Sequence, residues 1–188
     1  MQTIVTVVLL WMHSFVCKRA PGRSGRHHAV NDLVVHSFAA AAAGAPVTKE
    51  PARLSRMDGK RPDGLTLVPW QSGKSLCWDV TMICFLAESY VNGVAREASA
   101  AAEVAASRKE QKYADLDSRY LFDSIAVETL GVLNSSDNSL LKEIGNKISL
   151  NTGESTEVSF LHQRILVLVQ RFNAILLHDS LPTIDCAD

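Results

Sequence analysis

The sequence has few cysteines and almost no net charge, and each shortage excludes a class of protein. Its four cysteines form no Cys-x-x-Cys pair and no dense framework, which argues against a disulfide-stapled secreted domain and favours a reducing compartment. The 188 residues carry a formal net charge of -1, so the chain is no histone-like polycation. Any contact with nucleic acid must therefore come from local basic clusters.

The chain also lacks an apolar run long enough to cross a bilayer as a helix. Its most apolar stretch, residues 3–12, resembles the core of a signal peptide but has no basic residue before it. We therefore expect no membrane partner. Secretion is the alternative localisation, and it depends wholly on this N-terminal stretch.

Apolar residues make up 47% of the chain, which is enough to supply the core of one domain. Apolar spacing and composition predict helices at residues 26–43, 94–116, 136–149 and 154–178. Strands are expected at residues 60–70, 75–81 and 122–130, the first two as an antiparallel hairpin. Residues 47–57 favour extended chain around Glu50-Pro51. This order predicts an α/β fold with a small mixed sheet flanked by helices.

Two aspartates mark the predicted hairpin. Asp63 opens the first strand and Asp79 lies near the end of the second, so their carboxylates could converge on a Mg²⁺ ion, with the carbonyl of Val80 as a backbone ligand. Glu50 is a candidate outer ligand or orienting base. A turn role is the alternative for Asp63, whereas Asp79 in its apolar run needs a partner or a metal.

Basic residues supply the second half of the predicted site. Lys109 and Lys112 stand three apart on one face of a predicted helix, where they would stabilise a phosphate or position water, or only solvate the helix. Arg164 and Arg171 share a face of the last predicted helix, and would contact a nucleic-acid backbone or form salt bridges. Three more candidates for nucleic-acid contact come from local basic clusters and the histidine pair: Arg26, His27 and Arg61.

Five separated blocks carry a family resemblance. They are Lys60-Arg61-Pro62-Asp63-Gly64-Leu65-Thr66-Leu67-Val68-Pro69-Trp70, Trp78-Asp79-Val80-Thr81, Lys112-Tyr113-Ala114-Asp115-Leu116, Ala126-Val127-Glu128-Thr129-Leu130-Gly131, and Gln163-Arg164 with Gln170-Arg171. Over residues 23–177 the chain resembles the restriction-like endonuclease region, of PD-(D/E)xK type, that follows the polymerase domain in reverse transcriptase proteins of non-LTR retroelements.

This resemblance implies a restriction-endonuclease-like fold and a nuclear enzyme. The implied activity is nicking of DNA with Mg²⁺ or Mn²⁺ to prime reverse transcription, with DNA and element RNA as partners. Asp63 and Asp79 would bind the metal with support from Glu50. Thr81 stands where the superfamily usually has lysine, so Lys109 or Lys112, in a Lys-x-x-Lys-Tyr pattern, would replace it.

Several departures from the family pattern leave an alternative open. Cys84 stands where an aspartate is usual, and Ser24 where a histidine is expected. Of the zinc knuckle only His13 and Cys17 remain, and two ligands cannot make a structural zinc site. We therefore divide the chain into an apolar segment with a knuckle remnant (1–22), an endonuclease-like domain (23–178) and a tail (179–188), truncated from a larger protein. The alternative is a non-catalytic remnant that binds nucleic acid or protein.

Overall fold

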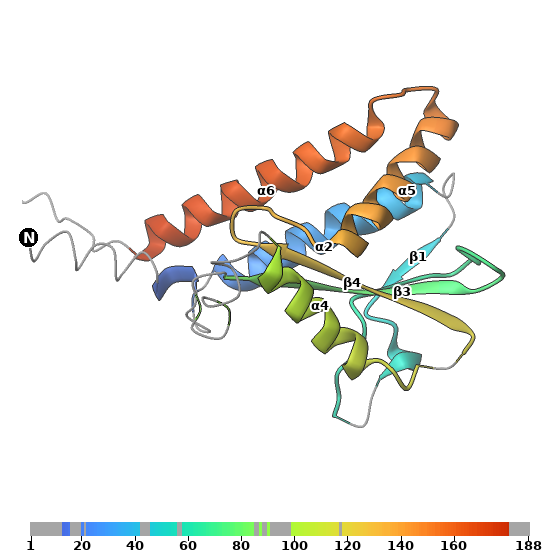
Figure 1. The fold of residues 1–188 in the computed structure, drawn as a ribbon, viewed down its shortest axis with the longest axis horizontal. Coiled ribbons are helices and arrows are strands. Elements are labelled where there is room, and N and C mark those ends of the chain that lie inside the picture. The colour runs from blue at the N-terminus through green and yellow to red at the C-terminus, as the bar shows by residue number, and fades with distance from the viewer. Residues whose placement is uncertain are drawn as a thin grey trace, which may run out of the picture.

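A four-stranded mixed sheet organises the computed structural model (Figure 1), which describes residues 13–15, 20, 22–41, 46–55, 58–84, 87, 90, 99–116 and 118–180. The strand order is β1 (Val47–Lys49), β2 (Gly64–Thr66), β3 (Ser75–Ile83) and β4 (Tyr120–Glu128). β1, β2 and β3 pair antiparallel, whereas β3 and β4 are parallel over their whole length. Parallel neighbours need a crossover connection, and helix α4 (Ala100–Lys112) lies in it.

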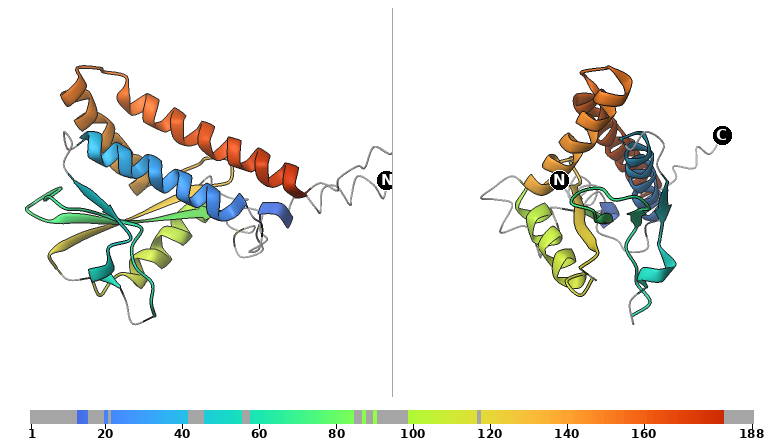
Figure 2. Two further views of the ribbon diagram at one scale, coloured as in Figure 1. Left: turned by 180° about the vertical axis from the view of Figure 1, so that it is seen from behind. Right: turned by 90° about the vertical axis from the view of Figure 1, so that its right-hand side faces the viewer.

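The helices cover the two faces of the sheet unequally (Figure 2). α4 covers one face, against β3 and β4. On the other face α2 (Gly22–Ala41) and α5 (Ser135–Thr152) contact the strands, and α6 (Glu157–Ser180) packs across both helices as an outer layer. A short 3₁₀ helix, η1 (Ala52–Leu54), follows β1.

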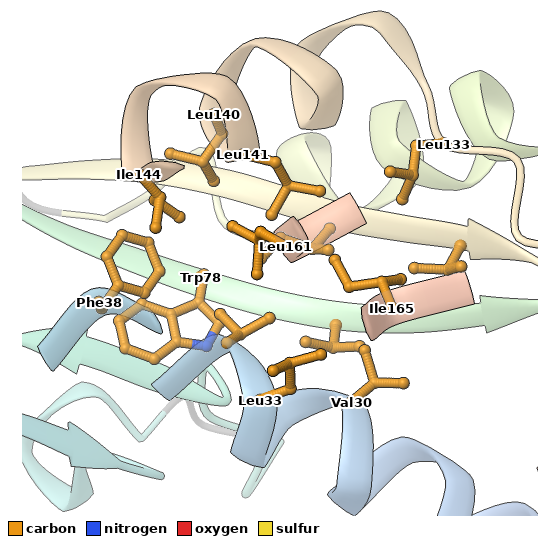
Figure 3. Packing of buried hydrophobic residues seen from close by; sticks show 14 of the residues in the cluster. Val30, Leu33, Phe38, Trp78, Leu133, Leu140, Leu141, Ile144, Leu161 and Ile165 are labelled. Carbon is orange, nitrogen blue, oxygen red and sulfur yellow. The ribbon is translucent and has the colours of Figure 1, made fainter. Parts of the chain in front are cut away.

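The main core lies between the sheet and α2, α5 and α6 (Figure 3). Trp78 of β3 is fully buried and stacks on Phe38 of α2, with 4.5 Å between ring centroids. Gly64 of β2 makes room for this indole, because a Cβ at Gly64 would come within 2.0 Å of the Trp78 ring. Successive side chains of a strand alternate between its faces, so Trp78 and Val80 point to this core while Asp79 points to α4.

Small side chains bring α4 close to the sheet. Ala101, Ala102, Ala105 and Ala106 are all buried and pack with Ile83 and Ala126 in a second cluster. The first turn of the helix is also anchored, since the Ala102 N–H donates to the buried carboxylate of Glu128 over 3.2 Å. A carboxylate at a helix N-terminus is favoured by the helix dipole. These contacts fix where the rest of α4 lies over β3.

The expected mixed α/β architecture is confirmed. The hairpin is confirmed too, because β2 and β3 pair antiparallel, although β2 is shorter than the predicted run 60–70. α2 begins at Gly22, four residues before the predicted start, and β1 was expected only as extended chain. Of the predicted helix 94–116, residues 94–98 lie outside the described part of the chain. Among the helices described, none combines the length and apolar character that crossing a membrane requires.

Candidate active site between strand β3 and helix α4

Asp79 is the buried acid of the candidate site. It is 4% exposed, at the middle of β3. The Lys109 Nζ donates to its Oδ1 over 2.5 Å, and the Tyr113 hydroxyl donates to its Oδ2 over 2.9 Å. Both carboxylate oxygens are therefore bonded and the charge is neutralised, which offsets the free energy that burying an anion costs.

Helical spacing places both donors over Asp79. Lys109 and Tyr113 are four residues apart and continue the buried alanine stripe of α4. The Tyr113 ring is buried against Phe122 of β4, with 4.7 Å between centroids. Lys112 Nζ donates to the Tyr113 oxygen over 2.9 Å, and burial, followed by the charge of Lys109, lowers the pKa of Lys112. The contacts therefore form a chain from Lys112 through Tyr113 to Asp79.

Asp63 is held by the strand next to it. β2 begins only at Gly64 and pairs with β3 at Trp78 and Cys77, so it does not reach Val80. The backbone groups of Val80 are bonded by side chains instead. The Val80 N–H donates to Asp63 Oδ2 over 2.7 Å, and His27 Nε2 lies 3.0 Å from both that oxygen and the Val80 carbonyl oxygen. Because the hydrogen bond with Asp63 favours the imidazolium, the pKa of His27 is raised.

α2 supplies a second side chain to this region. Asn31, one helical turn after His27, donates from Nδ2 to the Asp63 carbonyl over 3.3 Å. Its Oδ1 accepts from the Trp78 indole N–H over 2.9 Å. His27 and Asn31 together tie α2 to the start of β2 and to β3, so the position of Asp63 is fixed from two sides.

The two groups of contacts adjoin on β3, because Asp79 and Val80 are consecutive residues. Carboxylate and carbonyl oxygens are the ligands that Mg²⁺ prefers, and Asp63, Asp79 and Val80 provide them. Within the described ranges, however, no group of three or more His, Cys, Asp or Glu side chains gathers closely enough to hold a metal by itself. Water and a substrate phosphate would have to complete any Mg²⁺ shell here.

Glu50 and Arg61 were predicted for different roles, and the structure pairs them with each other. Both side chains are exposed. Glu50 follows β1 with a φ of 45°, and its N–H donates to the Asp63 carbonyl over 3.0 Å. The Glu50 backbone therefore supports Asp63, while its carboxylate is held by Arg61.

The other predicted nucleic-acid contacts lie apart from Asp79. Arg26 is 1% exposed and donates to Asn173 Oδ1 over 2.7 Å, so its guanidinium is an internal link between α2 and α6 rather than a surface group. Arg164 and Arg171 are exposed on α6. Because α6 belongs to the face of the sheet that α4 does not cover, the sheet separates both residues from Asp79.

Tyr113 and Asn31 are the contacts that sequence reasoning left without a role in the site. The signal for Tyr113 was its spacing of four residues from Lys109, and for Asn31 its spacing of four residues from His27. Thr81 lies two residues after Asp79 on β3 and so on the same face, which is the face that Lys109 reaches. Of the knuckle remnant, His13 is exposed and Cys17 lies outside the described residues. Cys84, which stands where the family usually has an aspartate, is a buried thiol directly after β3.

Comparison of the chain with protein-family models found no match, and comparison with curated proteins found none either.

Proposed function

We propose that this chain is a metal-dependent, restriction-like DNA endonuclease region of a retroelement reverse transcriptase protein. The observation that carries the proposal is the contact between Asp79 on a central strand and Lys109 on the crossover helix. The family resemblance implies that a lysine on this helix replaces the one absent at Thr81, and the contact of Lys109 with Asp79 supports that replacement. In this proposal the enzyme nicks DNA in the nucleus, and element RNA is a further partner.

The donor set fits Mg²⁺ or Mn²⁺. His27 Nε2 lies 3.0 Å from two oxygens, of Asp63 and Val80, so two oxygen acceptors face the same point. Mg²⁺ is commonly held by one or two carboxylates with waters and substrate phosphates. Asp63, Asp79 and the Val80 carbonyl would hold the ion. When bound, it would polarise the phosphodiester and lower the pKa of a water molecule.

The side chains around Asp79 have separate tasks in the proposed reaction. Lys109 would place its ammonium charge against the attacked phosphate, where charge develops in the transition state. Tyr113 orients the Asp79 carboxylate. Lys112 Nζ, whose pKa is lowered, would position the attacking water or stabilise the phosphate, and Glu50 would support Asp63 through its backbone.

A nicking assay tests the proposal. The purified chain is incubated with supercoiled plasmid and Mg²⁺, and the relaxed product is measured. Asp79→Asn and Lys109→Met should each lower the nicking rate by about 100-fold or more, whereas Glu110→Gln, an exposed neighbour on α4, should leave it unchanged. Circular dichroism confirms that each variant is folded. Equal nicking by the parent chain and Asp79→Asn would overturn the assignment.

A non-catalytic remnant of the same element is the second candidate. It is favoured by Asp79, whose two oxygens are both bonded by protein donors, and by the lack of a side-chain metal cluster within the described residues. Calorimetric titration separates the two candidates. An endonuclease should bind Mg²⁺ or Mn²⁺ and lose that binding in Asp79→Asn, while a remnant should show no binding and no nicking.

A further inference from the structure

A groove of about 570 Å³ lies between α2 and α6. Its walls include Asp32 and His36 on α2, and Phe160, Arg164, Val167 and Arg171 on α6. This volume is within the range of sites that bind ligands or side chains of a partner. We call it the α2/α6 groove. The sheet separates it from Asp79, so it has no place in the proposed nicking reaction.

The α6 wall of the groove carries large apolar side chains on an exposed face of the helix. α6 already buries one face, formed by Leu161, Ile165, Val169 and Leu176. Phe160 and Val167 lie on a different face and are 53% and 69% exposed. A surface helix is normally polar there, and large apolar side chains gathered at a groove indicate a contact with another molecule.

The same wall is positively charged. Arg164 and Arg171 alternate with Phe160 and Val167 along one stripe of α6, and within the described residues neither guanidinium has a carboxylate partner. Asp32 on the opposite wall is paired with Lys49 and so offsets little of this charge. Seven residues of helix separate the two arginines by about 10.5 Å along the axis.

We infer that the α2/α6 groove docks an acidic amphipathic helix of a partner protein. Apolar residues on one face of that helix would cover Phe160 and Val167, as in other helix-in-groove contacts. Two carboxylates seven residues apart would match the spacing of Arg164 and Arg171, and arginine binds carboxylates through two parallel hydrogen bonds. A nucleic-acid backbone would satisfy the arginines but would leave Val167 exposed, so the apolar stripe favours a peptide.

A charge-swap experiment tests this inference. The probe is a stapled helical peptide with leucines along one face and two glutamates seven residues apart beside them, and a second peptide has lysines in place of the glutamates. Binding to the full chain is measured by fluorescence anisotropy. The glutamate peptide should bind. The double variant Arg164→Glu with Arg171→Glu should lower the affinity for this peptide by about tenfold or more and raise the affinity for the lysine peptide. Arg53→Glu, exposed on η1, should change neither peptide.

Three results would overturn the inference. Equal affinity for both peptides would show that the arginines do not select an acidic partner. Self-association that Val167→Asp abolishes would make a second copy of the chain the occupant. Tighter binding of a single-stranded oligonucleotide than of the glutamate peptide, lost in the double arginine variant, would make nucleic acid the occupant. Asp79→Asn should leave the affinity for the glutamate peptide unchanged, because the sheet separates Asp79 from the groove, so the groove and the proposed active site are tested separately.

Discussion

Asp79 shows how a single buried charge depends on its donors. The side chain of Asp79 is 5% exposed and that of its partner Lys109 is 27% exposed, so solvent screens the pair only in part. Removing one member of such a pair leaves the other charge without compensation, which is more destabilising than replacing both. The interaction between Asp79 and Lys109 can therefore be measured from protein stability, without an activity assay.

Lys109→Met should lower the free energy of unfolding by about 1–3 kcal/mol, because Asp79 then stays buried with only the Tyr113 hydroxyl to bond its carboxylate. The double variant with Asp79→Asn should cost less than the sum of the two single variants. Urea denaturation of the parent chain, the two single variants and the double variant measures their free energies of unfolding. Lys142→Met, exposed on α5, should stay within about 0.5 kcal/mol of the parent. Additive effects would show that the two side chains do not interact.

Local spacing selected several residues of the candidate site, whereas contacts between distant segments could not be predicted from the sequence. Asp63, Asp79 and Lys109 were selected from spacing and family pattern, and the structure brings Lys109 to Asp79. The bond between His27 and Asp63 joins residues 36 positions apart, and it depends on where α2 crosses the sheet, which no local pattern encodes. His27 was therefore expected at the surface near phosphate instead of at this carboxylate.

At the scale of elements, α5 and α6 approach each other at a glycine. A Cβ on Gly145 of α5 would lie 2.7 Å from the Cα of Val158 on α6. This contact is with backbone, so the helices themselves would have to separate. The glycine thus sets the distance between α5 and α6, and through α6 it affects one wall of the α2/α6 groove.

Gly145→Ala should destabilise the protein by about 1–3 kcal/mol, the usual cost of overpacking, although alanine has the higher helix propensity. Thermal unfolding followed by circular dichroism measures the change. Asn146→Ala is the matched control, because this neighbour is exposed and should be neutral or slightly stabilising. A rise in the melting temperature of Gly145→Ala would contradict the close approach of the two helices.

Elements with a local signal were predicted as helices or strands, whereas pairing between distant segments was not predicted. Apolar periodicity identified α5 and α6 because each buries a continuous stripe. β1 has three residues and exists through its pairing with β2 fifteen residues later, so the segment gave no periodic signal of its own. The parallel pairing of β4 with β3 depends likewise on where α4 directs the chain.

Two side chains, those of Asp137 and His27, bind a proton more tightly in the folded protein than in the unfolded chain. Asp137, at the start of α5, is fully buried, and burial raises its pKa to about 9, whereas an unfolded aspartate titrates near 3.9. His27 also has a raised pKa, through its hydrogen bond with Asp63. In both cases the folded state binds more protons than the unfolded state, so stability must fall as the pH rises.

The melting temperature should therefore decrease steadily from pH 6 to pH 8.5. The stability that His27 contributes is complete below its unfolded pKa of about 6.5 and is lost as the pH rises through its folded pKa. Asp137 adds a further loss of unfolding free energy between pH about 4 and about 9. For one proton this loss is at most about 1.4 kcal/mol per pH unit. Asp137→Asn and His27→Gln should each flatten the pH profile, and His36→Gln, exposed on α2, should not. A melting temperature that rises with pH, or a profile unchanged by both variants, would show that the folded state does not hold these protons.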